Sequence, residues 1–213
     1  MPKVDTASAN RSTTVVTKTF NATLPLAGAV LEQPTEAELR DVRCFKYADY
    51  DYVYGQCGSD YVRHVLDCIP ILNKHKRVLI DVKVHDLKPS NVPCVPGWHL
   101  DGSVNPEGLP KRPETLTIFV TGCMALTKFL DEPIKLDVPE GLNFAAMNRV
   151  CARMIPKDHP THTISSCQFA TYNDTYFHTG TAAQGVERRL LVRTTETDII
   201  KPQNRIYTPH THK

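Results

Sequence analysis

Short stretches in which apolar and polar residues alternate recur along the chain, and they predict a protein built mainly of β-strands. The clearest stretch is residues 77–86, whose apolar positions are Val78, Ile80, Val82 and Val84. Successive side chains of a strand point to opposite faces, so these positions predict one buried, apolar face. The other face is expected either to line a pocket or to meet solvent.

Four downstream segments also have the apolar character of strands. They are residues 115–130, which are predicted to hold one or two strands, 133–138, 163–178 and 188–196. In the last segment Arg188 shares one face with Leu190 and Val192, whereas Arg189 lies on the other face. Because the first face is otherwise apolar, we expect Arg188 to point inward, where a buried charge must be paired.

Helical signals mark three other segments. Residues 34–43 begin with a proline and carry acidic residues in the expected first turn, and residues 59–70 start at a capping serine and present one apolar stripe. Residues 139–154 have apolar residues at helical spacing and are predicted to be a helical insertion packed outside the sheets. The tyrosines of residues 47–54 fit an aromatic platform for a substrate or, alternatively, packing at the edge of a sheet.

The length of 213 residues fits one domain with a single core. We expect that domain to cover residues 21–200, between a flexible N-terminal arm at residues 1–20 and a polar C-terminal tail at residues 201–213. Seven cysteines without a C-x-x-C pair argue against a disulfide framework and favour a reducing, cytoplasmic location. A net charge of +2 gives no strong field for nucleic acid or an anionic membrane, and no apolar run approaches the roughly 20 residues of a membrane span.

The candidate chemistry begins at His99 and Asp101. On a strand, residues i and i+2 point the same way, so this imidazole and this carboxylate would converge on one point. A third ligand is expected from a distant strand, and His178 is the best candidate because a strand follows it. Two histidines and one carboxylate, with the opposite face left open, form the ligand set of non-haem Fe(II) oxygenases. Trp98 beside the pair and His85 on the 77–86 strand are candidate pocket or substrate residues.

An arginine pair follows the downstream histidine, with Arg188 ten residues after His178 and Arg189 next to it. A guanidinium binds a carboxylate through two parallel hydrogen bonds. An arginine one hairpin away from a metal ligand is therefore well placed to hold the distal carboxylate of a keto acid. We prefer Arg188 for this role because of its apolar face, with Arg189 as the alternative.

The order of His99, Asp101, His178 and the arginine pair resembles that of the Fe(II)/2-oxoglutarate-dependent dioxygenases, in particular the phytanoyl-CoA-hydroxylase-like branch, over residues 77–196. The resemblance implies a double-stranded β-helix, that is, a cupin-like jelly roll with peripheral helices and a metal inside its mouth. It also implies Fe(II) as cofactor, 2-oxoglutarate and O2 as co-substrates, and succinate and CO2 as co-products. The substrate expected is a small molecule or a protein side chain that becomes hydroxylated.

Other assignments stay open. His85, His159 or His162 could replace His178 as the third ligand, although the last two lie in a proline-flanked loop that suits rigid coordination poorly. A zinc hydrolase could use the same ligands, but no glutamate close in sequence to either histidine offers an obvious general base. The alternative function from another class is a non-catalytic jelly-roll protein that serves in binding or assembly.

Overall fold

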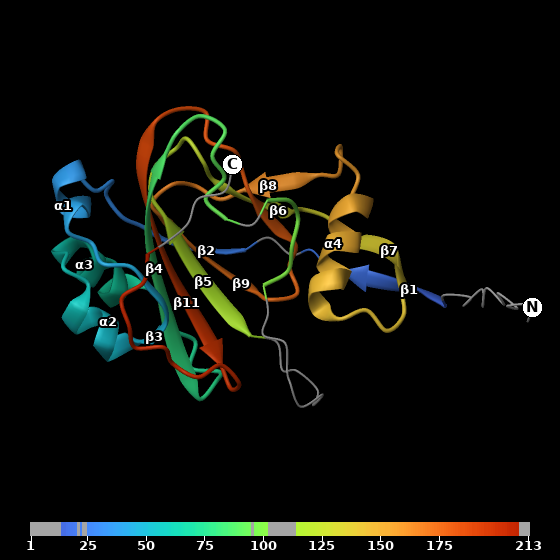
Figure 1. The fold of residues 1–213 in the computed structure, drawn as a ribbon, viewed down its shortest axis with the longest axis horizontal. Helices are drawn as coiled ribbons and strands as arrows, with labels where there is room; N and C mark the ends of the chain where they lie inside the picture. Colours follow the sequence, from blue (N-terminus) through green and yellow to red (C-terminus); the bar gives the residue numbers. More distant parts are fainter. Residues whose placement is uncertain (1–13, 21, 23–24, 95, 102–113, 209–213) are drawn as a thin grey trace, which may run out of the picture.

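The structure is a computed structural model, and it describes residues 14–20, 22, 25–94, 96–101 and 114–208. The chain is mainly β, with antiparallel sheets and few helices (Figure 1). The helices are α1 (Glu36–Arg40), α2 (Tyr50–Gln56), α3 (Asp60–Cys68) and α4 (Phe144–Met154). The strands are β1 (Val15–Phe20), β2 (Leu26–Val30), β3 (Phe45–Asp49), β4 (Arg77–Leu87), β5 (Thr115–Val120), β6 (Thr127–Leu130), β7 (Ile134–Pro139), β8 (Thr161–Thr163), β9 (Gln168–Asn173), β10 (His178–Gly180) and β11 (Glu187–Thr197).

Three antiparallel sheets organise the described strands. The largest has six strands in the order β2-β9-β5-β11-β4-β3, with β11 between β5 and β4. A three-stranded sheet has the order β10-β6-β8, and β1 pairs with β7 in a third. The long pairing of β11 with β4 runs from Glu187 opposite Leu87 to Thr197 opposite Arg77, and it fixes which side chains of the two strands share a face.

The two faces of the six-stranded sheet have different partners. Helices α1, α2 and α3 cover one face (Figure 1), and the core between them contains Val62, Val65, Phe119, Leu190 and Val192. The opposite face of β5 packs towards β6 through a second cluster that includes Ile118 and Phe129. Helix α4 lies on this second side with β7, against a third cluster (Figure 1).

The helix predictions for residues 34–43, 59–70 and 139–154 are confirmed, with shorter bounds. Each helix begins at a side-chain cap, which satisfies backbone N–H groups that the first turn leaves without partners. Thr35 and Glu38 form a reciprocal capping box on α1, Ser59 accepts from the Val62 N–H on α3, and Asn143 accepts from the Ala146 N–H on α4. None of the helices in the described part of the chain is long and apolar enough to cross a membrane.

Several boundaries differ from the predictions. Residues 15–20, assigned to a flexible arm, form β1, while residues 1–13 of that arm lie outside the described residues. The tyrosine cluster lies largely on α2 rather than at a sheet edge. The start of the polar tail is packed, because the Tyr207 N–H donates to the Cys44 carbonyl at 2.9 Å and Ile206 bridges to Phe45. Residues 209–213 of that tail lie outside the described residues.

Candidate metal centre

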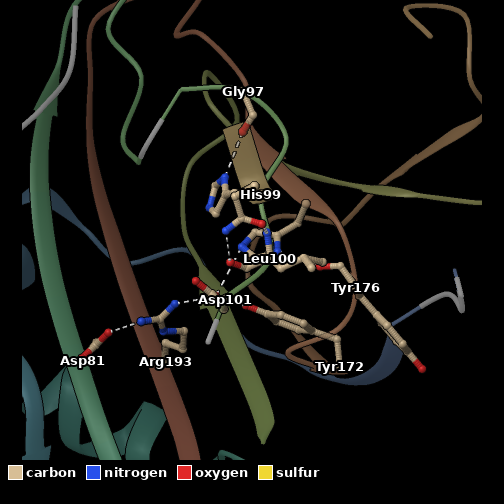
Figure 2. Close-up of polar contacts among 10 residues, drawn as sticks. Asp81, Gly97, His99, Leu100, Asp101, Tyr172, Tyr176 and Arg193 are labelled. Atoms are coloured by element: carbon tan, nitrogen blue, oxygen red, sulfur yellow. Dashed lines mark hydrogen bonds and ion pairs between the residues drawn. The ribbon is translucent and has the colours of Figure 1, made fainter. Parts of the chain in front are cut away.

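Backbone pairing brings the two predicted histidine ligands together. The His99 N–H donates to the His178 carbonyl and the His178 N–H donates to the His99 carbonyl, each at 3.0 Å. Residues that exchange both hydrogen bonds in an antiparallel pair present their side chains on the same face. Asp101, two residues beyond His99, joins the histidines on that face (Figure 2).

The three side chains form a compact ligand set. One ligand atom from each of His99, Asp101 and His178 lies within 4.8 Å of the others, and the imidazole centroids are 4.5 Å apart. Among the residues that the structure describes, this is the one group of three or more His, Cys, Asp or Glu with such spacing. The predicted convergence of these three residues is therefore what the structure shows.

Each histidine is held in the tautomer that a metal requires. The Nδ1 atom of His99 lies 2.9 Å from the Gly97 carbonyl, and that of His178 lies 3.1 Å from the Tyr176 carbonyl. A carbonyl only accepts, so each Nδ1 carries a proton, and each Nε2 is the ring nitrogen left to bind a metal. Burial, with the neighbouring His178, lowers the pKa of His99, which keeps this imidazole neutral as metal binding needs.

Asp101 receives its protein contacts on one oxygen. Its Oδ2 accepts from Arg193 Nη1 at 2.7 Å and from the Tyr172 hydroxyl at 3.1 Å, and it lies 3.3 Å from His178 Nε2. Within the described residues no hydrogen bond reaches Oδ1, which leaves that oxygen for a cation. Burial alone would raise the Asp101 pKa, but the Arg193 guanidinium and then His178 hold it well below its ordinary value, so the carboxylate is ionised.

Arg193 connects the ligand set to the sheet. Its Nη2 lies 2.5 Å from Oδ2 of Asp81 on β4, so one guanidinium bridges two carboxylates (Figure 2). Asp81 also accepts from the Tyr47 N–H at 2.6 Å. Arg193 had no role assigned to it from the sequence alone. The available signal was its spacing, because Arg189 and Arg193 are four residues apart on one face of a predicted strand.

A cavity of about 710 Å³ opens beside the ligand set, and Arg189 lies in its wall. Arg189 is 1% exposed, and neither its Nε nor its Nη1 has a hydrogen-bond partner among the described residues. Burial lowers its pKa to about 10, so the guanidinium remains charged near neutral pH. A buried cation without a partner is costly, and an anion bound in the cavity would satisfy it.

The expectation that the Arg188 side chain points into the pocket is wrong. Arg188 pairs with Asp86 at 3.3 Å, its side chain is 33% exposed, and it does not line the cavity. Its apolar strand neighbours, Leu190 and Val192, pack against the helical layer rather than into the cavity. An apolar strand face indicates burial, but it does not indicate which of two buried layers the face meets.

The remaining candidate residues differ in whether they line the cavity: His85 does, and the others do not. His85 is 2% exposed, lies opposite Arg189 in the β4–β11 register and lines the cavity. Trp98 is half-buried against the cluster around α4 and does not line the cavity. His159 lies away from the ligand set, with its Nε2 2.9 Å from the Glu132 carbonyl, and His162 is exposed on β8.

Comparisons of the chain with protein-family models, with curated proteins and with solved structures gave no match.

Proposed function

We propose that the protein is an Fe(II)- and 2-oxoglutarate-dependent dioxygenase that hydroxylates a C–H bond of its substrate. The observation that carries the proposal is a His-Asp-His ligand set that shares one cavity with a buried arginine lacking a partner among the described residues. The ligand set fits Fe(II), and the arginine fits the distal carboxylate of a chelating keto acid.

The strand order supports a double-stranded β-helix as the finer description of the fold. Four strands of the large sheet run β9-β5-β11-β4, and the isolated bridge between His99 and His178 adds the segment at His99 to the edge of the smaller sheet, beside β10, β6 and β8. Two facing four-stranded antiparallel sheets constitute a jelly roll. The cysteine usage of the sequence, seven cysteines without a C-x-x-C pair, supports the proposed cytoplasmic location.

Each residue of the site has a role that follows from its contacts. His99, Asp101 and His178 would hold the metal from one side, and the open side faces the cavity. Arg189 would bind the distal carboxylate of 2-oxoglutarate, while Arg193 and Tyr172 fix the orientation of Asp101. Bound Fe(II) would supply the O2 chemistry that protein side chains lack. Overall, one atom of O2 would enter the succinate formed as 2-oxoglutarate loses CO2, and the other would convert the substrate C–H to C–OH.

The proposal is tested by succinate release and by 2-oxoglutarate binding. With Fe(II), ascorbate and O2, the full chain should convert 2-oxoglutarate to succinate and CO2. Arg189→Met should weaken 2-oxoglutarate binding by about 2–4 kcal/mol, or roughly 30- to 1000-fold, because the partner of a buried carboxylate is lost. Calorimetric titration of Mn(II)-loaded protein measures this dissociation constant without turnover.

Arg188→Met is the matched control, because it removes the same charge one residue away on the other face of β11. It should leave the dissociation constant for 2-oxoglutarate within about twofold of wild type. If wild-type protein neither binds 2-oxoglutarate nor releases succinate, the oxygenase proposal fails. The non-catalytic jelly roll and the zinc hydrolase would then be the functions to pursue.

A further inference from the structure

The cavity beside the ligand set is strongly cationic. Among its described lining residues there is one carboxylate, Asp101, against the cations Lys46, Lys83, Arg149, Arg189 and Arg193. Arg193 is already neutralised by Asp101 and Asp81. Arg189 is the group that we assign to the keto acid. Lys46, Lys83 and Arg149 therefore remain as positive charges in the cavity once Arg193 is paired and Arg189 is assigned to the keto acid.

Lys83 is the inner member of this remaining charge. It lies on β4 opposite Leu191, on the same strand face as Asp81 and His85, and both Lys83 and His85 line the cavity. Its side chain is half-buried, and its ammonium makes no hydrogen bond or ion pair in the described part of the chain. Burial, and after it the nearby Arg193, lowers its pKa. A strongly hydrated ammonium held in this way favours an anionic partner.

Lys46 and Arg149 extend the same charge outwards. Both line the cavity and both are exposed, Lys46 on β3 and Arg149 on α4. Exposed cations around the opening of a cavity raise the local concentration of anions and speed their association. Positive charge thus extends from the exposed residues Lys46 and Arg149 to the half-buried Lys83.

We infer that the substrate of this site is itself an anion, carrying a carboxylate or a phosphate group that Lys83 binds. This inference rests on the proposed function, since it takes Arg189 as the partner of 2-oxoglutarate. Lys83 then acts as a specificity residue that selects an anionic substrate over a neutral or cationic one.

The experiment is a calorimetric titration of the Mn(II)-loaded full chain, saturated with 2-oxoglutarate, with inorganic phosphate and separately with acetate. The better of the two probes identifies the class of anionic group. Lys83→Met should weaken binding of that probe at least tenfold, whereas Lys83→Arg, which keeps the charge, should stay within a few-fold of wild type. Lys135→Met, at an exposed position on β7, is the matched control and should bind as wild type does.

Two results would overturn the inference. In the first, neither probe binds wild-type protein, or Lys83→Met binds the probe as tightly as wild type. In the second, Lys83→Met weakens 2-oxoglutarate itself as much as Arg189→Met does, which would assign Lys83 to the co-substrate. Circular dichroism of each variant verifies that the fold is retained.

A further titration separates this inference from the proposed function. Metal-free Arg189→Met protein lacks both the metal and the competing guanidinium, so probe binding there reports on Lys83. Binding that disappears in the double variant Arg189→Met/Lys83→Met supports the anion site even if wild-type protein fails to bind 2-oxoglutarate. Binding that persists in the double variant contradicts it.

Discussion

The guanidinium of Arg193 lies between two carboxylates from different parts of the chain, Asp81 on β4 and Asp101 beside the histidines. Burial alone would lower the pKa of Arg193, but Asp101 and Asp81 raise it well above its ordinary value. Removal of one member of such a group leaves the others as uncompensated buried charges. Arg193 therefore stabilises the fold and also fixes the orientation of the Asp101 carboxylate.

We expect Arg193→Met to lower the free energy of unfolding of the metal-free protein by about 3–5 kcal/mol, because two carboxylates lose their shared partner. Arg188→Met breaks the ion pair with Asp86, whose side chain is 74% exposed, and should cost less than about 1 kcal/mol. Urea denaturation of both variants measures the difference. Equal losses in the two variants would contradict the role of Arg193.

At the scale of single residues, the convergence of His99, Asp101 and His178 was predictable, and the direction of the two arginines was not. His99 and Asp101 follow directly from the two-residue period of a strand. The expected direction of Arg188 was wrong because both faces of β11 are buried along most of its length, so the hydrophobic pattern could not distinguish the helix side from the cavity side. The sequence pattern did not reveal that Arg188 pairs with Asp86.

Helix α4 contributes to the site although none of its residues is a ligand. Asn148 accepts from the Leu100 N–H at 3.2 Å and donates to the Leu100 carbonyl at 3.1 Å. Leu100 lies between His99 and Asp101, so one side-chain amide holds the backbone that carries both ligands. This double contact takes the place of a neighbouring strand on that segment.

We expect Asn148→Leu to weaken binding of Mn(II) or Fe(II) by roughly 10- to 100-fold, as loss of outer-sphere partners of metal ligands commonly does. Asn143→Ala is the control, because it removes the cap of the same helix, at a cost of about 1 kcal/mol, without touching Leu100. Metal titration of both variants gives the comparison. Weaker metal binding in Asn143→Ala of the same size would mean that helix stability alone matters.

At the scale of elements, capped helices were predictable and α2 was not. Tyr50, Tyr52 and Tyr54 alternate with other residues and so imitate a strand. In the structure Tyr50 and Tyr54 stack across one turn of α2, with ring centroids 5.9 Å apart. Strand β8 was missed for a different reason, since its three residues are exposed and leave no hydrophobic pattern.

Across the whole molecule, the ligand set joins segments that are far apart in sequence. Residues 99–101 and β10 come from different parts of the chain and meet at a single described backbone bridge. A cation held by His99, Asp101 and His178 would bind the folded chain and not the unfolded one. Metal binding should therefore be linked to global stability.

We expect metal at a hundred times its dissociation constant to stabilise the fold by about 2.7 kcal/mol, and to raise the melting temperature by roughly 5–10 °C. Asp101→Ala should abolish this shift, while His162→Ala, at an exposed position on β8, should retain it. Thermal unfolding with and without Mn(II), followed by EDTA, measures both effects. A shift that survives in Asp101→Ala would place the metal elsewhere.

The mainly β architecture was predictable because 77–86 alternates and 188–196 has apolar strand character, and these segments became the longest pair of strands. The pairing of β1 with β7 was not, because residues 1–20 have the composition of a solvated arm and contact a distant segment. The hydrophobic pattern of a short segment does not indicate which distant strand it will pair with.

The two different faces of β11 make this protein sensitive to errors of strand register during folding. One of its faces supplies apolar side chains to the helical layer and the other supplies Arg189 and Arg193 to the cavity. A slip of a single position against β4 would exchange the two sets, turning the guanidinium groups of Arg189 and Arg193 into the helical layer and away from the cavity. A molecule with this shifted register would lose both the cavity arginines and the packing of its core. Cellular quality control that recognises exposed apolar surface would therefore also remove molecules with a defective site.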